Sequence, residues 1–252
     1  MRKSIVGALA VVSVASLGAG LQAQDGPAGN DAREARSIVR KGIQALGGRE
    51  ALNKTKVSTW KEQGTYYGMG DGLPYTGEYA VEWPDKFKMT IQGVFTIVLK
   101  GDKGWMGSAG MVRELTGDEL AEQQEQNHSR YVASLLFLGT RGYRLAKLDD
   151  AEVDGKPAAV VKVTREGRRD VTLSFDKDSG LLVKAEYRLK SPEQGGKEVT
   201  EEAFLREYRE VDGVKLATKL VVNRDGQKFV ETDLSDTRFP EKLDASVFAK
   251  PQ

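Results

Sequence analysis

The sequence contains no cysteine and a single histidine, and these two shortages exclude much of common protein chemistry. Without thiols there are no disulfides, no thiolate zinc or iron–sulfur sites and no cysteine nucleophile. A catalytic triad or a histidine-rich metal site would depend on His128 alone, which stands in a polar run. We therefore interpret His128 as a solvated helix histidine, and we expect no catalytic residue, no metal site and no cofactor.

Neither sign of charge dominates the chain. The formal net charge is +1, with 38 basic and 37 acidic residues. Removal of Arg2 and Lys3 with the N-terminal leader described below would bring it to about −1. This balance provides no electrostatic footprint for nucleic acid or for an anionic membrane surface, so no nucleic-acid partner is expected.

Nucleotide-binding and hydrolase motifs are missing as well. The glycine-rich stretch 101–110, GDKGWMGSAG, lacks the Gly-Lys-Ser/Thr ending of a phosphate loop and the spacing of a dinucleotide site. It also lacks the proline and the many triplets of collagen. We predict two hairpin turns that flank a short strand carrying Trp105 and Met106, with the direction of the Trp105 indole left open.

Several acidic clusters could bind a metal ion or act in catalysis. The segment 176–180, DKDSG, resembles the start of a calcium loop but lacks the later ligands, so a hairpin turn is the better interpretation. Asp149 and Asp150 with Glu152, or Glu201 with Glu202, could supply the paired carboxylates of a hydrolase. Nothing in the sequence marks two of them as buried or coupled, so solvated loop and strand faces are expected.

The N-terminus has the pattern of an export signal. A short basic segment precedes an apolar run from Ile5 to Leu21, and small residues follow before Gln24. We interpret residues 1–23 as a cleaved signal peptide, with an uncleaved anchor as the alternative, and we expect a periplasmic protein. The absence of a following cysteine excludes lipid attachment there. Residues 24–30 read as a flexible lead-in.

Residues 31–252 are expected to form one domain. Apolar residues at helical spacing predict a helix over 31–46, and a second helical zone covers 116–138; both begin with a capping-box pattern. The remaining chain alternates with a period of two and predicts about eleven or twelve strands separated by turns, including two Val-Asp-Gly turns. The fold class is therefore mainly β with some helix, as one antiparallel, curled sheet or barrel.

Aromatic residues and methionines gather in the N-terminal half of this sheet. They are explained either by an ordinary barrel core or by a cavity for an apolar ligand. The residues predicted to line that cavity are Trp60, Tyr79, Val81, Trp83, Phe87, Met89, Ile91, Phe95, Trp105 and Met111.

The order of the motifs is similar to that of the LolA/LolB-like superfamily of outer-membrane lipoprotein-sorting proteins. The segments that carry the resemblance are "ALGG" after the first helix, "WPDKFKM", "GDKGWM", "EVDGKPAAVVKV", "FDKDSGLL", "YREVDGVKLATKLVV" and "FPEKLDASVFAKP". The resemblance covers about residues 32–251. It implies an incomplete antiparallel β-barrel around helices that act as a lid, with a cavity for acyl chains. The lipobox cysteine of the receptor type is absent, and no arginine is assigned as a lid-closing residue.

These observations lead to a non-catalytic carrier for the acyl chains of lipoproteins or lipids in the periplasm. The candidate partners are an inner-membrane transporter and an outer-membrane acceptor. The alternative is an envelope-stress sensing or protein-interaction module on the same fold. Two segments are candidates for the lid, although both could be ordinary core helices: they contribute Ile38, Val39, Ile43 and Leu46, and Tyr131, Leu135 and Leu136.

Overall fold

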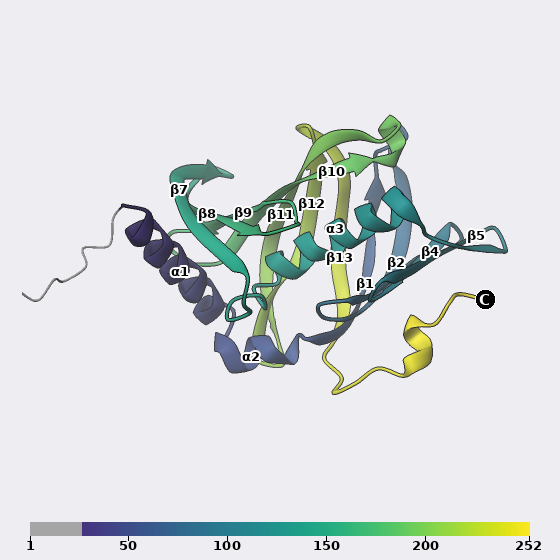
Figure 1. The fold of residues 1–252 in the computed structure, drawn as a ribbon, viewed down its shortest axis with the longest axis horizontal. Helices are drawn as coiled ribbons and strands as arrows, with labels where there is room; N and C mark the ends of the chain where they lie inside the picture. The colour runs from purple at the N-terminus through teal and green to yellow at the C-terminus, as the bar shows by residue number, and fades with distance from the viewer. Residues whose placement is uncertain (1–26) are drawn as a thin grey trace, which may run out of the picture.

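The computed structural model describes residues 27–252, so the expected signal peptide lies outside the described residues. These residues form one antiparallel sheet of thirteen strands, with helices against it (Figure 1). The strands are β1 Val57–Tyr66, β2 Leu73–Glu82, β3 Lys86–Ile91, β4 Phe95–Lys100, β5 Lys103–Ser108, β6 Met111–Glu114, β7 Tyr143–Val153, β8 Lys156–Arg165, β9 Val171–Asp176, β10 Leu182–Ser191, β11 Lys197–Val211, β12 Val214–Arg224 and β13 Gln227–Arg238. The helices are α1 Pro27–Ala45, α2 Gly48–Lys54 and α3 Gly117–Ala133, with short 3₁₀ turns η1 Pro192–Gln194 and η2 Ala245–Phe248.

The sheet has the order β6-β5-β4-β3-β2-β1-β13-β12-β11-β10-β9-β8-β7. Pairing of β1 with β13 brings the two ends of the domain together, and it leaves β6 and β7 as edges. The chain between these two edges is α3, which crosses the sheet instead of closing it (Figure 1). The predicted fold class, an incomplete antiparallel β-barrel with helices, is therefore confirmed, with thirteen strands in place of eleven or twelve.

Irregularities in the long strands help the sheet to curl. Glu207 in β11 and Asp236 in β13 have positive φ angles of 53° and 51°. The pairing of β1 with β13 also shifts register between Thr59 and Lys61. Such bulges add local twist, which lets a wide sheet wrap around a helix.

The predicted turns are confirmed. Asp154-Gly155 has φ angles of 51° and 75°, and Asp212-Gly213 has 50° and 80°, so the two Val-Asp-Gly segments are two-residue hairpin turns with both central residues left-handed. The Asp176 carboxylate accepts hydrogen bonds from the Ser179 amide (2.7 Å) and hydroxyl (2.6 Å), as a hairpin turn requires. The glycine-rich stretch forms β5 between a turn at 101–102 and a turn at 109–110.

Three helix expectations need correction. Helix α1 begins at Pro27, so residues 27–30 are helical and the Asp31–Glu34 pattern is not its cap; proline suits a first helical turn because its missing N–H is not needed there. The Thr116 side chain makes no capping hydrogen bond to α3. Helix α3 ends at Ala133, because Leu135 adopts a left-handed φ of 61°, so the apolar segment after it is a series of turns.

Candidate ligand-binding face

One face of the sheet is apolar over β2, β3 and β4. Because side chains alternate along a strand, Val81, Phe87, Ile97 and Leu99 point to the same side, where each is at least 94% buried. We call this side the inner face, since α3 lies on it: the Arg130 guanidinium sits 5.0 Å from the Phe87 ring centroid. The inner face also carries Trp60, Tyr79, Trp83, Met89 and Phe95 as half-buried neighbours, and Ile91, which pairs with Phe95.

Two of the residues predicted to line a cavity are not on this buried surface. Trp105 pairs with Val98 and packs with Ala80 and Phe248 on the opposite, outer face, under the C-terminal tail. This answers the question about the indole: it is a packing residue of the outer face. Met111 follows a hairpin turn and is 75% exposed. A short strand between glycines does not reveal which alternate side faces inward, so the sequence left the side of Trp105 open. A role of either residue in ligand binding stays a prediction.

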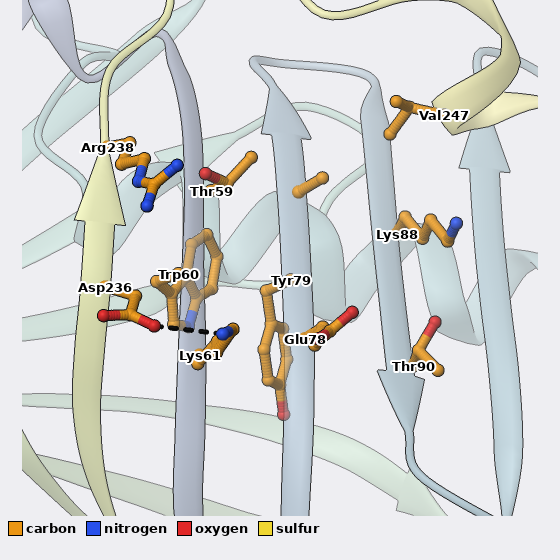
Figure 2. Close-up of a pocket in the computed structure, with 11 residues that line it drawn as sticks. Thr59, Trp60, Lys61, Glu78, Tyr79, Lys88, Thr90, Asp236, Arg238 and Val247 are labelled. Carbon is orange, nitrogen blue, oxygen red and sulfur yellow. Dashed lines mark ion pairs between the residues drawn. The ribbon is translucent and has the colours of Figure 1, made fainter.

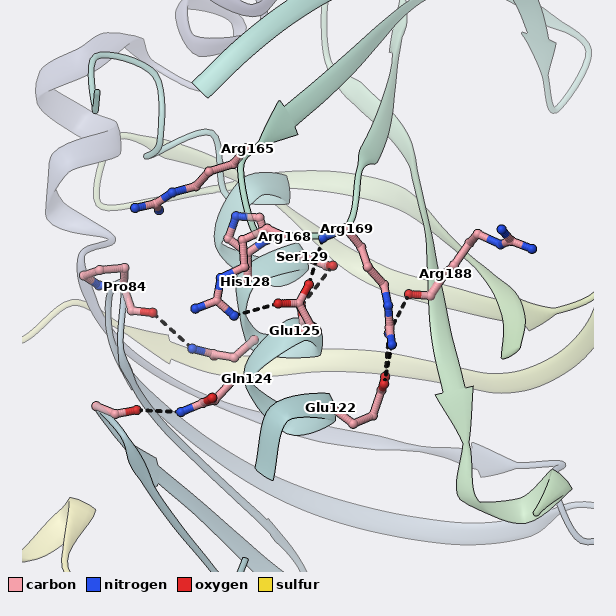
Figure 3. A network of polar contacts seen from close by, with 12 residues as sticks. Pro84, Glu122, Gln124, Glu125, His128, Ser129, Arg165, Arg168, Arg169 and Arg188 are labelled. Carbon is pink, nitrogen blue, oxygen red and sulfur yellow. Dashed lines mark hydrogen bonds and ion pairs between the residues drawn. The ribbon is translucent and has the colours of Figure 1, made fainter. Parts of the chain in front are cut away.

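Helix α3 is held over the inner face by polar contacts on one side (Figure 3). The Arg169 guanidinium donates two hydrogen bonds to Glu122, of 3.0 and 2.8 Å. The Arg168 guanidinium donates to Glu125 at 2.7 Å, and the Arg169 backbone amide donates to the same carboxylate at 2.9 Å. The turn between β8 and β9 therefore binds two successive acidic residues of the helix.

The other side of α3 is fastened to turns of the N-terminal strands. The Asn127 amide donates to the Pro84 carbonyl at 3.0 Å, and the Gln124 amide donates to the Gly101 carbonyl at 3.0 Å. The helix thus bridges the two halves of the open sheet through side-chain hydrogen bonds. Such contacts at partly exposed positions contribute little each, about 0–1 kcal/mol for an ion pair, so they can be exchanged for water at modest cost.

The residues predicted to form a lid belong to one core cluster. Val39 and Ile43 of α1, and Leu46 directly after it, pack with Val161 and Leu173 of the sheet. Gly42 is required at this contact, since a Cβ there would lie 2.6 Å from the Phe175 ring. Tyr131, Leu135 and Leu136 complete the same cluster, and Ile38 packs against it half-buried. The structure therefore brings both proposed lid segments together, and their movement remains a prediction.

A buried carboxylate stands in the middle of the inner face. Glu62 accepts hydrogen bonds from Trp60 Nε1 at 3.1 Å and from the Tyr75 hydroxyl at 2.9 Å. Burial raises the pKa of Glu62, and these aromatic donors oppose the rise. Arg130 extends toward the same region, and its Nη1 atom is buried with no hydrogen-bond partner among the described residues. Sequence reasoning missed this site, because a Glu in an alternating strand resembles any solvated residue.

A second buried carboxylate corrects one of the acidic-cluster predictions. Glu201 is only 7% exposed, accepts a short hydrogen bond from the Tyr187 hydroxyl, and receives the Arg224 Nε atom at 2.9 Å. Burial raises the pKa of Tyr187 well above its usual value. The neighbouring Glu202 bonds to Lys184 instead, so the two carboxylates face different partners and do not form a hydrolytic pair. Asp149, Asp150 and Glu152 are exposed, as expected.

His128 is also buried, contrary to the prediction of a solvated histidine. The residue is 8% exposed, and its ring stacks on Tyr143 with centroids 5.8 Å apart and places Nε2 at 3.1 Å from the Tyr143 hydroxyl. Arg165 donates to that same hydroxyl at 3.0 Å. Burial lowers the pKa of His128 to about 4, so the imidazole is neutral at neutral pH. Within residues 27–252, no group of three His, Asp or Glu residues is placed to hold a metal.

Two hollows in the described residues open on the outer face. One of about 310 Å³ is lined by Thr59, Lys61, Lys88 and Arg238, with Val247 of the C-terminal tail at its rim (Figure 2). Another of about 830 Å³ is bordered by Gln63, Thr65, Glu231 and Asp233. Both are lined mainly by the alternate residues opposite the inner face. In this structure α3 and its side chains occupy the concave side.

Between Pro27 and Gln252, none of the helices has the length and apolar content needed to cross a membrane. No protein-family model matches the chain, and no curated protein matches it in sequence. Solved structures do match its fold.

The matching structures include three with TM-scores above 0.5. A DUF1329 family protein from Desulfovibrio piger superposes at a TM-score of 0.60 with 14% identity, over 87% of this chain and 97% of the other. A LolA superfamily protein from Nitrosomonas europaea gives 0.57 with 15% identity, over 86% and 97%. A putative outer membrane lipoprotein-sorting protein domain from Vibrio parahaemolyticus gives 0.52 with 14% identity, over 86% and 97%. The chain therefore has the LolA-like fold, as the order of its sequence motifs indicated.

Proposed function

We propose that the protein is a non-catalytic periplasmic carrier that holds the acyl chains of lipoproteins or lipids against the inner face of its sheet. The observation that carries the proposal is an apolar face, centred on Val81, Phe87 and Leu99, that is covered by a helix fastened through polar side chains. The fold likeness to a lipoprotein-sorting domain supports the same role.

The energetics are consistent with displacement of α3 by an acyl chain. Moving a chain out of water contributes about 0.8 kcal/mol for each CH₂ group. Displacement of α3 releases the ion pairs to Arg168 and Arg169 and also the core contacts of Tyr131 and Val132, and burial of a long chain has to offset both costs. We expect a long acyl chain to do so, to replace α3 on the inner face, and the helix to return when the ligand leaves.

The test is native mass spectrometry of protein purified from cell envelopes, together with titration by a fluorescent fatty acid. We expect a co-purifying lipid and saturable probe binding. Met89→Lys places a charge on the inner face and should weaken probe binding at least tenfold. Thr90→Lys places the same side chain on the outer face and should leave binding unchanged. Protein that is always empty and does not respond to the probe would contradict the proposal.

The second candidate is a protein-interaction or envelope-sensing module on the same fold. It is favoured by one observation: the two hollows described above lie on the outer face, while α3 occupies the concave side. This candidate predicts a stable complex with an envelope protein that survives removal of lipid. Affinity capture from detergent-extracted envelopes, before and after delipidation, separates it from the carrier. An inner-membrane transporter or an outer-membrane acceptor would be captured by a carrier only while lipid is present.

A further inference from the structure

Four of the five large hydrophobic side chains exposed in residues 27–252 lie at hairpin connections. They are Met69 (78% exposed), Leu73 (53%), Val94 (55%) and Met111 (75%), and we call them the hairpin rim. The fifth, Leu148, is 38% exposed and lies on β7, the far edge strand. Exposed large apolar side chains that gather at one end of a polar protein mark a contact site.

The hairpin rim is confined to one end of the sheet. Met69 and Leu73 belong to the β1–β2 connection, Val94 to the β3–β4 connection and Met111 to the β5–β6 connection. Because neighbouring strands run in opposite directions, these three connections share an end. The turns at the other end of the same strands expose Pro84, Asp85, Gly101 and Asp102 instead.

Hydrogen bonds join the three connections side by side. The Ser108 hydroxyl, next to the β5–β6 turn, donates to the Val94 carbonyl at 2.9 Å. The Gln92 amide, in the β3–β4 turn, donates to the Thr76 carbonyl of β2 at 3.0 Å. The turns nevertheless project from the body: a Cβ built on Gly70, Gly93 or Gly110 would meet no described atom within 4 Å. The rim is therefore a row of protruding apolar tips and not a groove.

The rim is continuous with the inner face. From the β3–β4 turn into β4 the exposed fraction falls from 55% at Val94 to 6% at Ile97 and 2% at Leu99, with Phe95 half-buried between them. An apolar molecule that touches the rim can thus move onto the inner face without crossing a polar barrier on this strand.

We infer that the hairpin rim docks the protein on a lipid bilayer, with its tips inserted at the boundary between head groups and acyl chains. The inference deepens the proposed carrier function. It rests on that function for the statement that lipid moves between the bilayer and the inner face. A bilayer fits better than a protein partner because the tips are separate protrusions from the body. Charge contributes little to this docking. In the segments 67–73, 92–94 and 108–112, the ionisable side chains are Asp71 and Tyr67 alone. Apolar side chains at such depth bind by burial of surface and need no anionic lipid.

The test uses the mature chain and floating vesicles of phosphatidylcholine alone. The wild-type protein should float with the vesicles, and high salt should not release it, since salt screens charges and not apolar contacts. The variant with Met69→Ser, Leu73→Ser, Val94→Ser and Met111→Ser should partition at least about tenfold less. Leu148→Ser is the matched control and should partition like the wild type. Equal flotation of the fourfold variant, or no flotation of the wild type, would overturn the inference.

A second measurement covers the case in which the fourfold variant folds poorly. Met111→Trp and Leu148→Trp each replace one exposed side chain in an otherwise intact protein. Vesicles should shift the emission of the added tryptophan to shorter wavelength in Met111→Trp and leave the emission of Leu148→Trp unchanged. No shift in Met111→Trp would overturn the inference. Binding only to vesicles that contain envelope proteins would also overturn it and assign the rim to a protein partner.

The failure of the inference differs from the failure of the carrier function. Fatty-acid probe binding in buffer without vesicles reports the inner face alone. A fourfold variant that binds the probe normally but does not float is the expected result. A wild-type protein that floats but binds no probe would contradict the carrier function and would still support membrane docking.

Discussion

Arg169 and Glu122 are joined by two hydrogen bonds of 2.8 and 3.0 Å, and this pair connects the β8–β9 turn to α3 across the opening of the sheet. Glu122 is nearly buried, with a side chain that is 9% exposed, whereas Arg169 is 25% exposed. A pair of this kind positions the helix without the strength of an apolar contact. It is therefore the place to test whether α3 moves.

We expect Arg169→Gln to loosen α3. Loss of the pair should lower the free energy of unfolding by about 1–2 kcal/mol, because Glu122 is left without its cationic donor. The same change should speed the uptake of a fatty-acid probe in stopped-flow fluorescence. Arg206→Gln is the control, since Arg206 forms an equally short two-point pair with Asp154 away from α3. Faster uptake in both variants would show that the effect is general destabilisation.

His128 should make the protein less stable in acid. Its pKa is lowered from 6.5 to about 4 by burial, so the unfolded chain takes up this proton more readily than the folded protein. The contribution is absent above about pH 6.5, and stability falls as the pH drops from there toward 4, by on the order of 2 kcal/mol. Denaturant titrations across this range should show the slope, and His128→Gln should flatten it. A variant with the wild-type slope would show that other groups are responsible.

Glu62 should act in the opposite direction. Burial raises its pKa above 4.5, so its contribution to stability is fully present below pH 4.5 and is lost as the pH rises through the folded-state pKa. Glu62→Gln removes this titration. The stability of the variant minus that of the wild type should therefore be larger at neutral pH than at pH 4.5. Thermal unfolding at the two pH values measures the difference. Glu78→Gln, on the neighbouring strand β2 and exposed, should change neither value.

Trp105 and Trp60 should report on different events. Trp105 lies under the C-terminal tail, so its emission should not respond to a bound acyl chain, whereas Trp60 on the inner face should respond. Comparison of Trp105→Phe with Trp60→Phe during a lipid titration checks this. Phe248→Ala should in turn free the tail, shift the Trp105 emission to longer wavelength and cost about 3–5 kcal/mol, because Phe248 is 1% exposed. A ligand response that disappears with Trp105→Phe would place the ligand on the outer face.

The fold was largely accessible from the sequence. Alternation in segments such as Tyr79–Trp83, with Asp-Gly turns at 154–155 and 212–213, depends on local backbone chemistry, and local chemistry is written in neighbouring residues. The apolar inner-face residues Val81, Phe87 and Met89 followed from the same alternation. The start of α1 at Pro27 and the end of α3 at Ala133 did not, since helix ends are decided by competing contacts within a few residues.

By itself, then, the sequence determined the strands, the turns, the absence of thiol chemistry and the LolA-like order of elements. The tertiary structure alone decided that Trp105 faces outward, that His128 and Glu201 are buried, and that Arg169 meets Glu122. The physical reason is the distance along the chain. Periodicity reports which residues share a face of one element, but it does not report which face another element covers, nor which charge 47 residues away will pair with a given carboxylate.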